Sequence, residues 1–287
     1  EGLSITDCTL NITQLGASLE LALTVTSSGV QKAFDIKAED NQGNSYITAF
    51  TEQVGTVAEL PAESKHGRLA KVVNLGGAED VYWSKFVADN GESGKGIWEE
   101  TVDPNASPGM DATTLPHELK NPTPNNFVLQ KGTWGTRNVG DATTNSHPSF
   151  VGNTIRQAFF HNNRLGFLTE DNVAMSKSDD FFNFYFTSAL TQTDDDPIDI
   201  NCSSIRPAVL HAVIPTAQGL ILFSRNQQFI MFSDAEILTP ASAVIRAVSN
   251  FEMATTIKPV EVGTAINFVS KTPSYTRIFG MQTRGSE

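Results

Sequence analysis

Three short apolar segments follow one another between residues 155 and 176, separated by two short polar breaks. The first, Ile155 to Phe160, meets His161-Asn162-Asn163, and the second, Leu165 to Leu168, meets Thr169-Glu170-Asp171-Asn172 before a third segment begins. Breaks of this length suit tight turns between strands. The spacing therefore predicts three antiparallel strands joined by two β-turns.

The same pattern recurs twice further along the chain. The three copies are AFFHNNRLGFLTEDNVAMSK, HAVIPTAQGLILFSRNQQFIMFS and EVGTAINFVSKTPSYTRIFGM, and aligning Leu165, Leu220 and Ala265 gives spacings of 55 and 45 residues. Blades of β-propellers repeat every ~40–50 residues. Because propellers close with about 4–8 blades, three copies predict either an incomplete propeller with blades outside this sequence or an open sandwich.

The preceding part of the chain also reads as strands. Leu19, Leu21, Leu23 and Val25 alternate with Glu20, Ala22, Thr24 and Thr26, as in a half-buried strand. Further strands are expected at Ala33 to Ala38, Ser45 to Phe50, Leu69 to Val73, Asp80 to Val87 and Gly96 to Val102, with a turn at Gly76-Gly77. The last three strands predict a meander, and no segment sustains a helical period.

Five prolines fall within residues 103–126, a density that interrupts helices and strand ladders. This stretch is expected to connect two domains, with one helical turn near Leu115 to Leu119. The predicted fold is all-β, with antiparallel meanders, incomplete propeller-like blades and a smaller β-rich domain. The predicted domains are a variable β module over 1–56, a small β-meander domain over 57–118 and a propeller-like domain over 119–287.

The chain is acidic, with a net charge of −12 and a pI of about 4.8. It lacks the clustered Lys and Arg that tight nucleic-acid binders use to displace counterions. An acidic surface still suits a conduit that DNA must slide past without adhering. No run of about 18 apolar residues predicts a membrane span. The absence of an initial Met or leader-like stretch before Glu1 suggests an excised piece of a longer protein.

Motifs for common chemistries are missing: the sequence has no GxSxG elbow, Walker loop, HExxH or dinucleotide-binding glycine motif. Its five histidines lack metal-ligand spacing. Cys8 and Cys202 lie far apart and are expected to be buried thiols rather than disulfide partners or zinc ligands. We expect no catalytic residue, no metal and no cofactor.

One acidic cluster is a weak metal-site candidate: Asp194, Asp195, Asp196 and Asp199 in TQTDDDPIDI. The alternatives are a calcium or magnesium site, glycosidase carboxylates, or a turn before a strand beginning at Ile198. The acids are consecutive rather than alternating and no glycine follows them, which favours the turn. Glu99 and Glu100 point to opposite faces of one strand and make a poor acid/base pair.

The aromatic stretch FFNFYF could stack on sugars or bases. As a strand it would place Phe182, Phe184 and Phe186 on one face and Phe181, Asn183 and Tyr185 on the other. A face made entirely of phenylalanine favours a core role over a ligand platform.

A long ordered block of motifs then points to a known family. It comprises Gly140-Asp141, Thr144-Asn145, Pro148-Ser149-Phe150-Val151-Gly152, Phe159-Phe160, Asn163-Arg164-Leu165-Gly166-Phe167-Leu168, Ser176, Phe182-Asn183-Phe184 and Asp194-Asp195-Asp196-Pro197-Ile198-Asp199. Leu115-Pro116-His117, the DVYWSKF and GIWEETV strands, Gln228-Phe229 and Leu238-Thr239-Pro240 extend it. Over residues 57–284 the chain resembles the tail tubular protein B family, the tail nozzle proteins of short-tailed bacteriophages.

This resemblance implies a structural protein of the virion tail, made in the host bacterial cytoplasm. Family members form a hexameric tube at the distal end of the tail, dock onto an adaptor ring of tail tubular protein A, help hold the tail fibres and line the channel for double-stranded DNA. No catalytic residue is implied. The fragment alone is expected to be a monomer.

The family motifs supply the candidate structural and interface residues: Pro148, Phe150, Gly152, Asn163, Arg164, Gly166 and Asp195. Asn162-Asn163 suits a tight hairpin turn. Gly166 is expected to let a neighbouring backbone approach closely. Arg164 is expected to form a buried or interface ion pair, with one of Asp194 to Asp196 as its partner.

Two other function classes stay open at this point. A tail-associated polysaccharide depolymerase or glycosidase would use the Asp194 to Asp199 cluster or Glu99. A carbohydrate-binding module would use residues 1–50.

Overall fold

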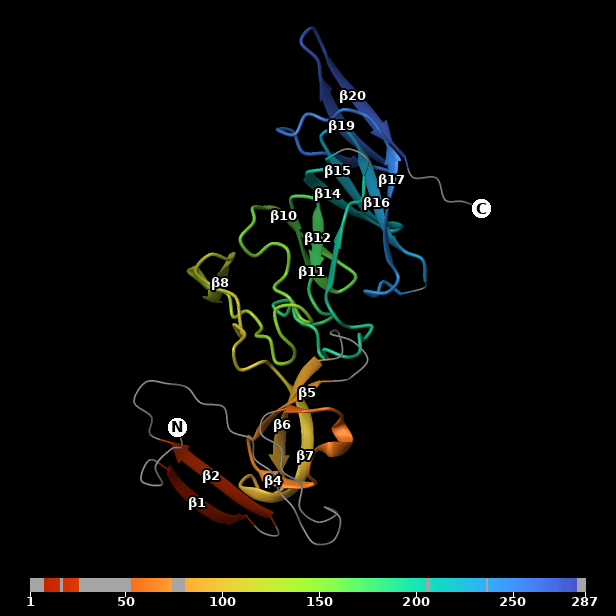
Figure 1. Cartoon of the computed structure of the whole chain (residues 1–287). Helices are drawn as coiled ribbons and strands as arrows, with labels where there is room; N and C mark the ends of the chain where they lie inside the picture. Colours follow the sequence, from red (N-terminus) through yellow and green to blue (C-terminus); the bar gives the residue numbers. More distant parts are fainter. Residues whose placement is uncertain are drawn as a thin grey trace. The chain divides into compact units, whose positions relative to one another are not determined.

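The computed structural model describes residues 8–15, 18–25, 53–73, 81–204, 207–235 and 237–282, the first two ranges as backbone only (Figure 1). Within these ranges the chain is all-β, as predicted, with one short 3-10 turn, η2 (Val57–Glu59). All strand pairs are antiparallel except β3 with β5. The strands predicted at Ala33 to Ala38 and Ser45 to Phe50, and the turn at Gly76-Gly77, lie outside the described residues.

The chain divides into two compact units, Glu1–Ala106 with Val139–Thr144, and Ser107–Asn138 with Asn145–Glu287. The division into three domains at residues 56 and 118 stays a prediction.

The first unit contains a hairpin and a five-stranded sheet. The hairpin pairs β1 (Cys8–Leu15) with β2 (Ser18–Val25), which includes the predicted alternating segment. The sheet has the order β3-β5-β6-β7-β4, made of β3 (Gln53–Val54), β5 (Leu69–Val73), β6 (Val81–Ala88), β7 (Ser93–Thr101) and β4 (Glu63–Lys65). The predicted meander is confirmed as β5, β6 and β7, which are antiparallel neighbours.

The proline-rich connection contains a hairpin rather than a helical turn. Strand β8 (His117–Thr123) pairs with β9 (Asn126–Lys131), so the helical turn predicted near Leu115 to Leu119 is wrong. The ladder shifts register between Lys120 and Thr123, and Pro122 lies within this shift. A proline is tolerated in a strand where the ladder is already interrupted. The density of prolines was therefore not sufficient to exclude strands from this connection.

The second unit contains three successive meanders that match the three sequence copies. The first sheet has the order β10-β11-β12-β13, the second β14-β15-β16-β17 and the third β18-β19-β20. Leu165, Leu220 and Ala265 each lie at or next to the start of the second strand of their sheet. The predicted repeat is therefore a repeat of antiparallel sheets.

The strands of these sheets are, in order, β10 (Ile155–His161), β11 (Arg164–Thr169), β12 (Asn172–Met175), β13 (Ile198–Asn201), β14 (Leu210–Thr216), β15 (Gly219–Ser224), β16 (Gln228–Ser233), β17 (Ala243–Ser249), β18 (Val260–Val262), β19 (Ala265–Lys271) and β20 (Thr276–Met281). Hairpins of two residues join β10 to β11 and β11 to β12. Asn162 and Asn163 have φ values of 45° and 59°, the left-handed geometry that asparagine tolerates in such turns.

Strand β15 shows how the sheets pack. All six of its residues are buried, although a strand with one wet face would alternate. Leu220 and Leu222 belong to the core shared with the first sheet, whereas Ile221 and Phe223 belong to the core shared with the third. Successive side chains of a strand point to opposite faces. The second sheet is therefore covered on both faces.

The aromatic stretch at 181–186 is not a strand, so its predicted alternation of faces is wrong. Phe184 and Tyr185 are adjacent in sequence and both buried. Phe184 packs in a cluster with Phe150, Phe167 and Trp134, with ring centroids 4.9 to 6.0 Å from its own. These contacts place Phe184 in a core.

Gly166 makes room for a ring and not for a backbone. It lies opposite Phe159 in the β10–β11 ladder, and a Cβ added to it would lie 2.1 Å from the Phe159 ring. Phe159 is itself buried in the core between the first two sheets. The glycine thus lets an aromatic side chain lie across the neighbouring strand.

We expect Gly166→Ala to lower the free energy of unfolding by about 1–3 kcal/mol, because a buried ring must move. Gly280→Ala is the control, since Gly280 is exposed in β20 and an added Cβ meets only Asn267 Oδ1, at 3.2 Å. Urea unfolding measures both. In a Phe159→Leu background, Gly166→Ala should lower the free energy of unfolding by less. An equal loss in both backgrounds would contradict the contact between Gly166 and the Phe159 ring.

Candidate functional site

Arg164 is the centre of a buried polar network at the start of β11, and it is 2% exposed. Its guanidinium donates hydrogen bonds to four backbone carbonyl oxygens, those of Ser176 at 2.8 Å, Asp194 at 2.8 Å, Asp195 at 3.3 Å and Asp196 at 2.6 Å. Arg164 therefore contacts the predicted acidic segment. It bonds to the backbone carbonyl oxygens of that segment and not, as predicted, to a carboxylate. Burial lowers the pKa of Arg164, and the nearby Asp195 and Asp196 oppose that shift.

The acidic cluster is used to shape the loop before β13. The Asp196 carboxylate is fully buried and accepts from the Thr187 amide at 3.0 Å, the Thr187 hydroxyl at 2.8 Å and the Thr193 amide at 2.8 Å. Asp195 is exposed. The hydrogen bond from the Thr193 hydroxyl is the largest cause of its lowered pKa, and the hydrogen bond from the Lys177 ammonium is the second. Carboxylates that accept several local hydrogen bonds hold turns together.

Asp199, in β13, joins a preceding loop to the neighbouring strand β12. Its Oδ2 accepts from the Ser149 amide at 2.6 Å, and its Oδ1 accepts from the Asn172 side chain at 3.1 Å. The segment around Ser149 is a compact loop in which the Val151 amide donates to the Pro148 carbonyl at 2.9 Å. Asp199 thus fixes this loop to β12 and β13.

The remaining predicted site residues lie in the same region. Pro148 and Phe150 are buried, and Gly152 has a φ of 81°, which favours glycine. Asn163 donates to Asp179 from its side chain, and its carbonyl accepts from the Asp179 amide at 3.1 Å. The structure therefore gathers these residues around the first sheet and its flanking loops.

The described residues contain no group of three or more His, Cys, Asp or Glu side chains that could hold a metal ion. Cys202 is a buried free thiol, and burial raises its pKa to about 12. The Cys8 side chain lies outside the described part of the chain. Among described helices, none is long and apolar enough to cross a membrane.

Sequence reasoning missed a second buried arginine, Arg137, which is 2% exposed. Its Nε donates to the Asn145 carbonyl at 2.6 Å and its Nη1 donates to the Ser107 carbonyl at 2.8 Å. The guanidinium lies over the Tyr185 ring, and the Tyr185 hydroxyl lies 2.6 Å from Nδ1 of His147. The residues around Arg137 do not indicate this buried role, because its hydrogen-bond partners are backbone carbonyl oxygens and not side chains of a recognisable type.

The β8–β9 hairpin presents an exposed apolar face. Leu119 and Leu129 are directly opposite each other and 67% and 68% exposed, and Phe127, on the same face as Leu129, is 64% exposed. Within the described chain the two strands form a sheet of their own. An isolated two-stranded hairpin is marginal in water, so this face is a candidate contact surface.

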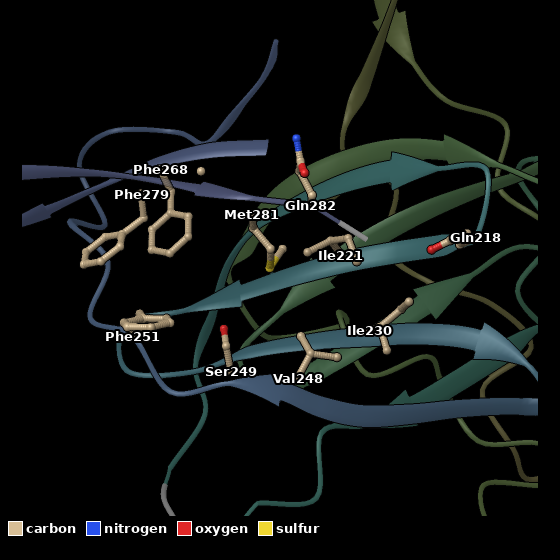
Figure 2. A pocket seen from close by; sticks show the side chains of 11 residues that line it. Gln218, Ile221, Ile230, Val248, Ser249, Phe251, Phe268, Phe279, Met281 and Gln282 are labelled. Atoms are coloured by element: carbon tan, nitrogen blue, oxygen red, sulfur yellow. The ribbon is translucent and has the colours of Figure 1, made fainter. Parts of the chain in front are cut away.

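A cavity of about 450 Å³ lies between the second and third sheets. Figure 2 shows Phe268, Phe279 and Met281 of the third sheet above it and Ile230 and Val248 of the second sheet below. Ser249 and Gln282 add polar groups to its lining. Its apolar lining without titratable groups suits packing against apolar side chains.

Arg164→Met should lower the free energy of unfolding by about 3 kcal/mol or more, because two buried and two partly buried carbonyl oxygens lose their donor. The matched control is Arg156→Met, which removes an exposed guanidinium 3.6 Å from Glu170 and should cost less than about 1 kcal/mol. Urea unfolding followed by fluorescence measures both. Similar small losses for the two variants would show that Arg164 does not anchor the loop.

Stability should fall as the pH drops below about 6.5. Burial, and then the Arg137 charge, lower the pKa of His147, so the folded protein binds this proton less readily than the unfolded chain. That contribution to stability is complete above the unfolded pKa and is lost progressively as the pH falls from there through the lowered pKa of the folded state. Urea midpoints at pH 7.5 and 5.5 measure the decline.

His147→Gln should make this decline smaller without abolishing it, since burial also lowers the pKa of His161 and His211. An unchanged decline in the variant would contradict the assignment to His147.

Comparison with known proteins identifies the family to which the chain belongs. The chain is 30% identical over 255 residues to tail tubular protein gp12 of Escherichia phage T7, an alignment that covers 88% of this chain and 31% of the T7 protein. The chain thus spans about a third of the length of the curated relative that it matches. The family described as bacteriophage nozzle protein matches residues 6–287. With nearly its whole length matched, the chain belongs to the bacteriophage nozzle protein family.

Proposed function

We propose that this chain is part of a structural subunit of a bacteriophage tail nozzle. The subunit is made in the host bacterial cytoplasm and becomes part of the virion tail. The observation that carries this proposal is the family match over residues 6–287. The described site supports it, because the buried arginine and the carboxylates of the acidic segment serve to hold loops and strands together.

In this proposal the full-length subunit forms a hexameric ring and docks on the tail tubular protein A adaptor. It also helps to hold the tail fibres and lines a channel through which double-stranded DNA leaves. The net charge of −12 supports the last role, because like charge discourages DNA from adhering to a wall it must pass. The role requires no catalytic group, metal or cofactor.

The β8–β9 hairpin is the proposed contact between copies in the ring. Its face of Leu119, Phe127 and Leu129 needs an apolar partner, and a second copy supplies one in a closed ring built from repeated contacts. The hairpin carries two lysines and one glutamate, whereas the whole chain is strongly acidic. This difference in charge favours contact between the hairpin and another copy.

Electron microscopy of the full-length parent chain, mixed with its tail adaptor protein, tests the nozzle proposal. We expect six-fold tubes with a central hole. Isolated particles that never join the adaptor would overturn the proposed function. The family match would then indicate a shared fold alone.

Changing the hairpin face should block assembly without unfolding the subunit. We expect the full-length double variant Leu119→Ser with Leu129→Ser to remain monomeric by sedimentation velocity, since the apolar contact is lost. Val57→Ser is the control, because Val57 is 54% exposed in the other compact unit. Circular dichroism checks that both variants fold, and normal rings from the double variant would contradict the hairpin contact.

A further inference from the structure

The third sheet has three strands, whereas the two preceding sheets have four each. By position, β18, β19 and β20 correspond to the first three strands of the other sheets. Among the described residues β20 pairs with β19 alone, so its other side presents unpaired backbone groups. Such an edge is a template for a further strand.

The fourth strand fills core space where it is present. In the first sheet, Ile198 and Ile200 of β13 belong to the core packed against the second sheet. On the facing side, Ala243 and Ile245 of β17 complete the same core. All four strands of each sheet thus contribute to this interface.

The interface between the second and third sheets differs at the corresponding place. Its core includes side chains of β19 and β20 but none from a fourth strand. The cavity of about 450 Å³ lies here, lined by Phe279 and Met281 of β20 and by Val248 of β17 (Figure 2). Val248 is 48% exposed, although it faces an apolar cavity. An unfilled apolar cavity beside an unpaired edge is the space that another strand would occupy.

We propose that a fourth strand pairs with the free edge of β20 and fills this cavity, and that it is donated by the part of the same polypeptide beyond residues 1–287. In the other sheets the fourth strand follows the third in sequence: β13 follows β12 and β17 follows β16. The T7 relative also contains much sequence outside the matched part, since the alignment covers 31% of it.

The chemistry of the cavity specifies the donated strand. It is extended, about as long as the six residues of β20, and apolar at alternate positions. Its apolar side chains lie on the same face as Phe279 and Met281, toward Val248. Medium-sized aliphatic side chains fit best, because the surrounding rings already occupy much of the space.

Hydrogen–deuterium exchange with mass spectrometry tests the proposal by comparing the 287-residue chain with the full-length parent, each at a concentration where sedimentation shows only monomers. We expect the edge-facing amides of Thr276–Met281 to exchange at least about 100-fold more slowly in the full-length protein. The peptide over Gln228–Ser233 is the internal control, because β16 already has a neighbour on each side in the 287-residue chain. Ring assembly plays no part in this readout, so failure of the nozzle proposal would not affect it.

Three results would overturn the proposal. Equal, fast exchange in both proteins would show that no strand is added. Slow exchange already in the monomeric 287-residue chain would show that its own residues cover the edge. Protection that appears only at concentrations where the chain dimerises would assign the strand to a second copy.

A cavity-filling variant gives an independent test. In the full-length protein, Val248→Trp should restore fast exchange in β20, because the indole competes with the donated side chains for the cavity. In the 287-residue chain the same substitution should leave the exchange of β20 unchanged. Val57→Trp is the matched control, an exposed valine that does not line the cavity. If the β20 amides of full-length Val248→Trp still exchange slowly, the result would contradict the proposal that side chains of the donated strand occupy the cavity.

Discussion

The second unit depends on the packing of one β-sheet against the next. A meander of three or four strands has two faces, and a sheet that is apolar on both must be covered on both. Strand β15 meets this requirement with six consecutive buried residues, which alternate between the cores shared with the first and third sheets. Removing either neighbouring sheet would expose half of that strand. The repeat in the sequence is the outcome of this constraint, since each copy must supply apolar side chains to its neighbours.

Polar interactions have a different task, which is to hold the long irregular segment between β12 and β13. This segment is 22 residues long, from Ser176 to Pro197, and it leaves the sheet before returning as its fourth strand. Arg164 binds its two ends at once, through the carbonyl oxygens of Ser176 and of Asp194 to Asp196. A planar guanidinium with five donors suits this better than lysine, because it bonds to several fixed acceptors simultaneously. The most conspicuous charged residues of the sequence therefore act in folding.

The sequence was informative where local chemistry decides the structure. Alternation and spacing predicted the strands of the meanders, and Asn162-Asn163 predicted a hairpin turn that the left-handed φ values show. Prediction from the sequence failed where contacts between residues distant along the chain determine the structure. Nothing local indicates that Phe159 lies over Gly166, that Arg137 binds the Asn145 and Ser107 carbonyls, or that FFNFYF turns away from a strand to bury Phe184 beside Phe150. Pro122 misled for a related reason, since its cost depends on whether the ladder is intact at that point.

The proposed role in a tube wall calls for rigid sheets and contact surfaces, and the stacked sheets and the exposed hairpin face support that proposal. The most direct test of this account is a side-chain-resolution cryo-EM map of the assembled phage tail. The account predicts that several copies of these stacked sheets surround a central channel at the distal end of the tail, with each β8–β9 hairpin covered by a neighbouring copy. Finding the chain in a fibre or elsewhere outside the tube wall, with the hairpin free in solvent, would contradict it.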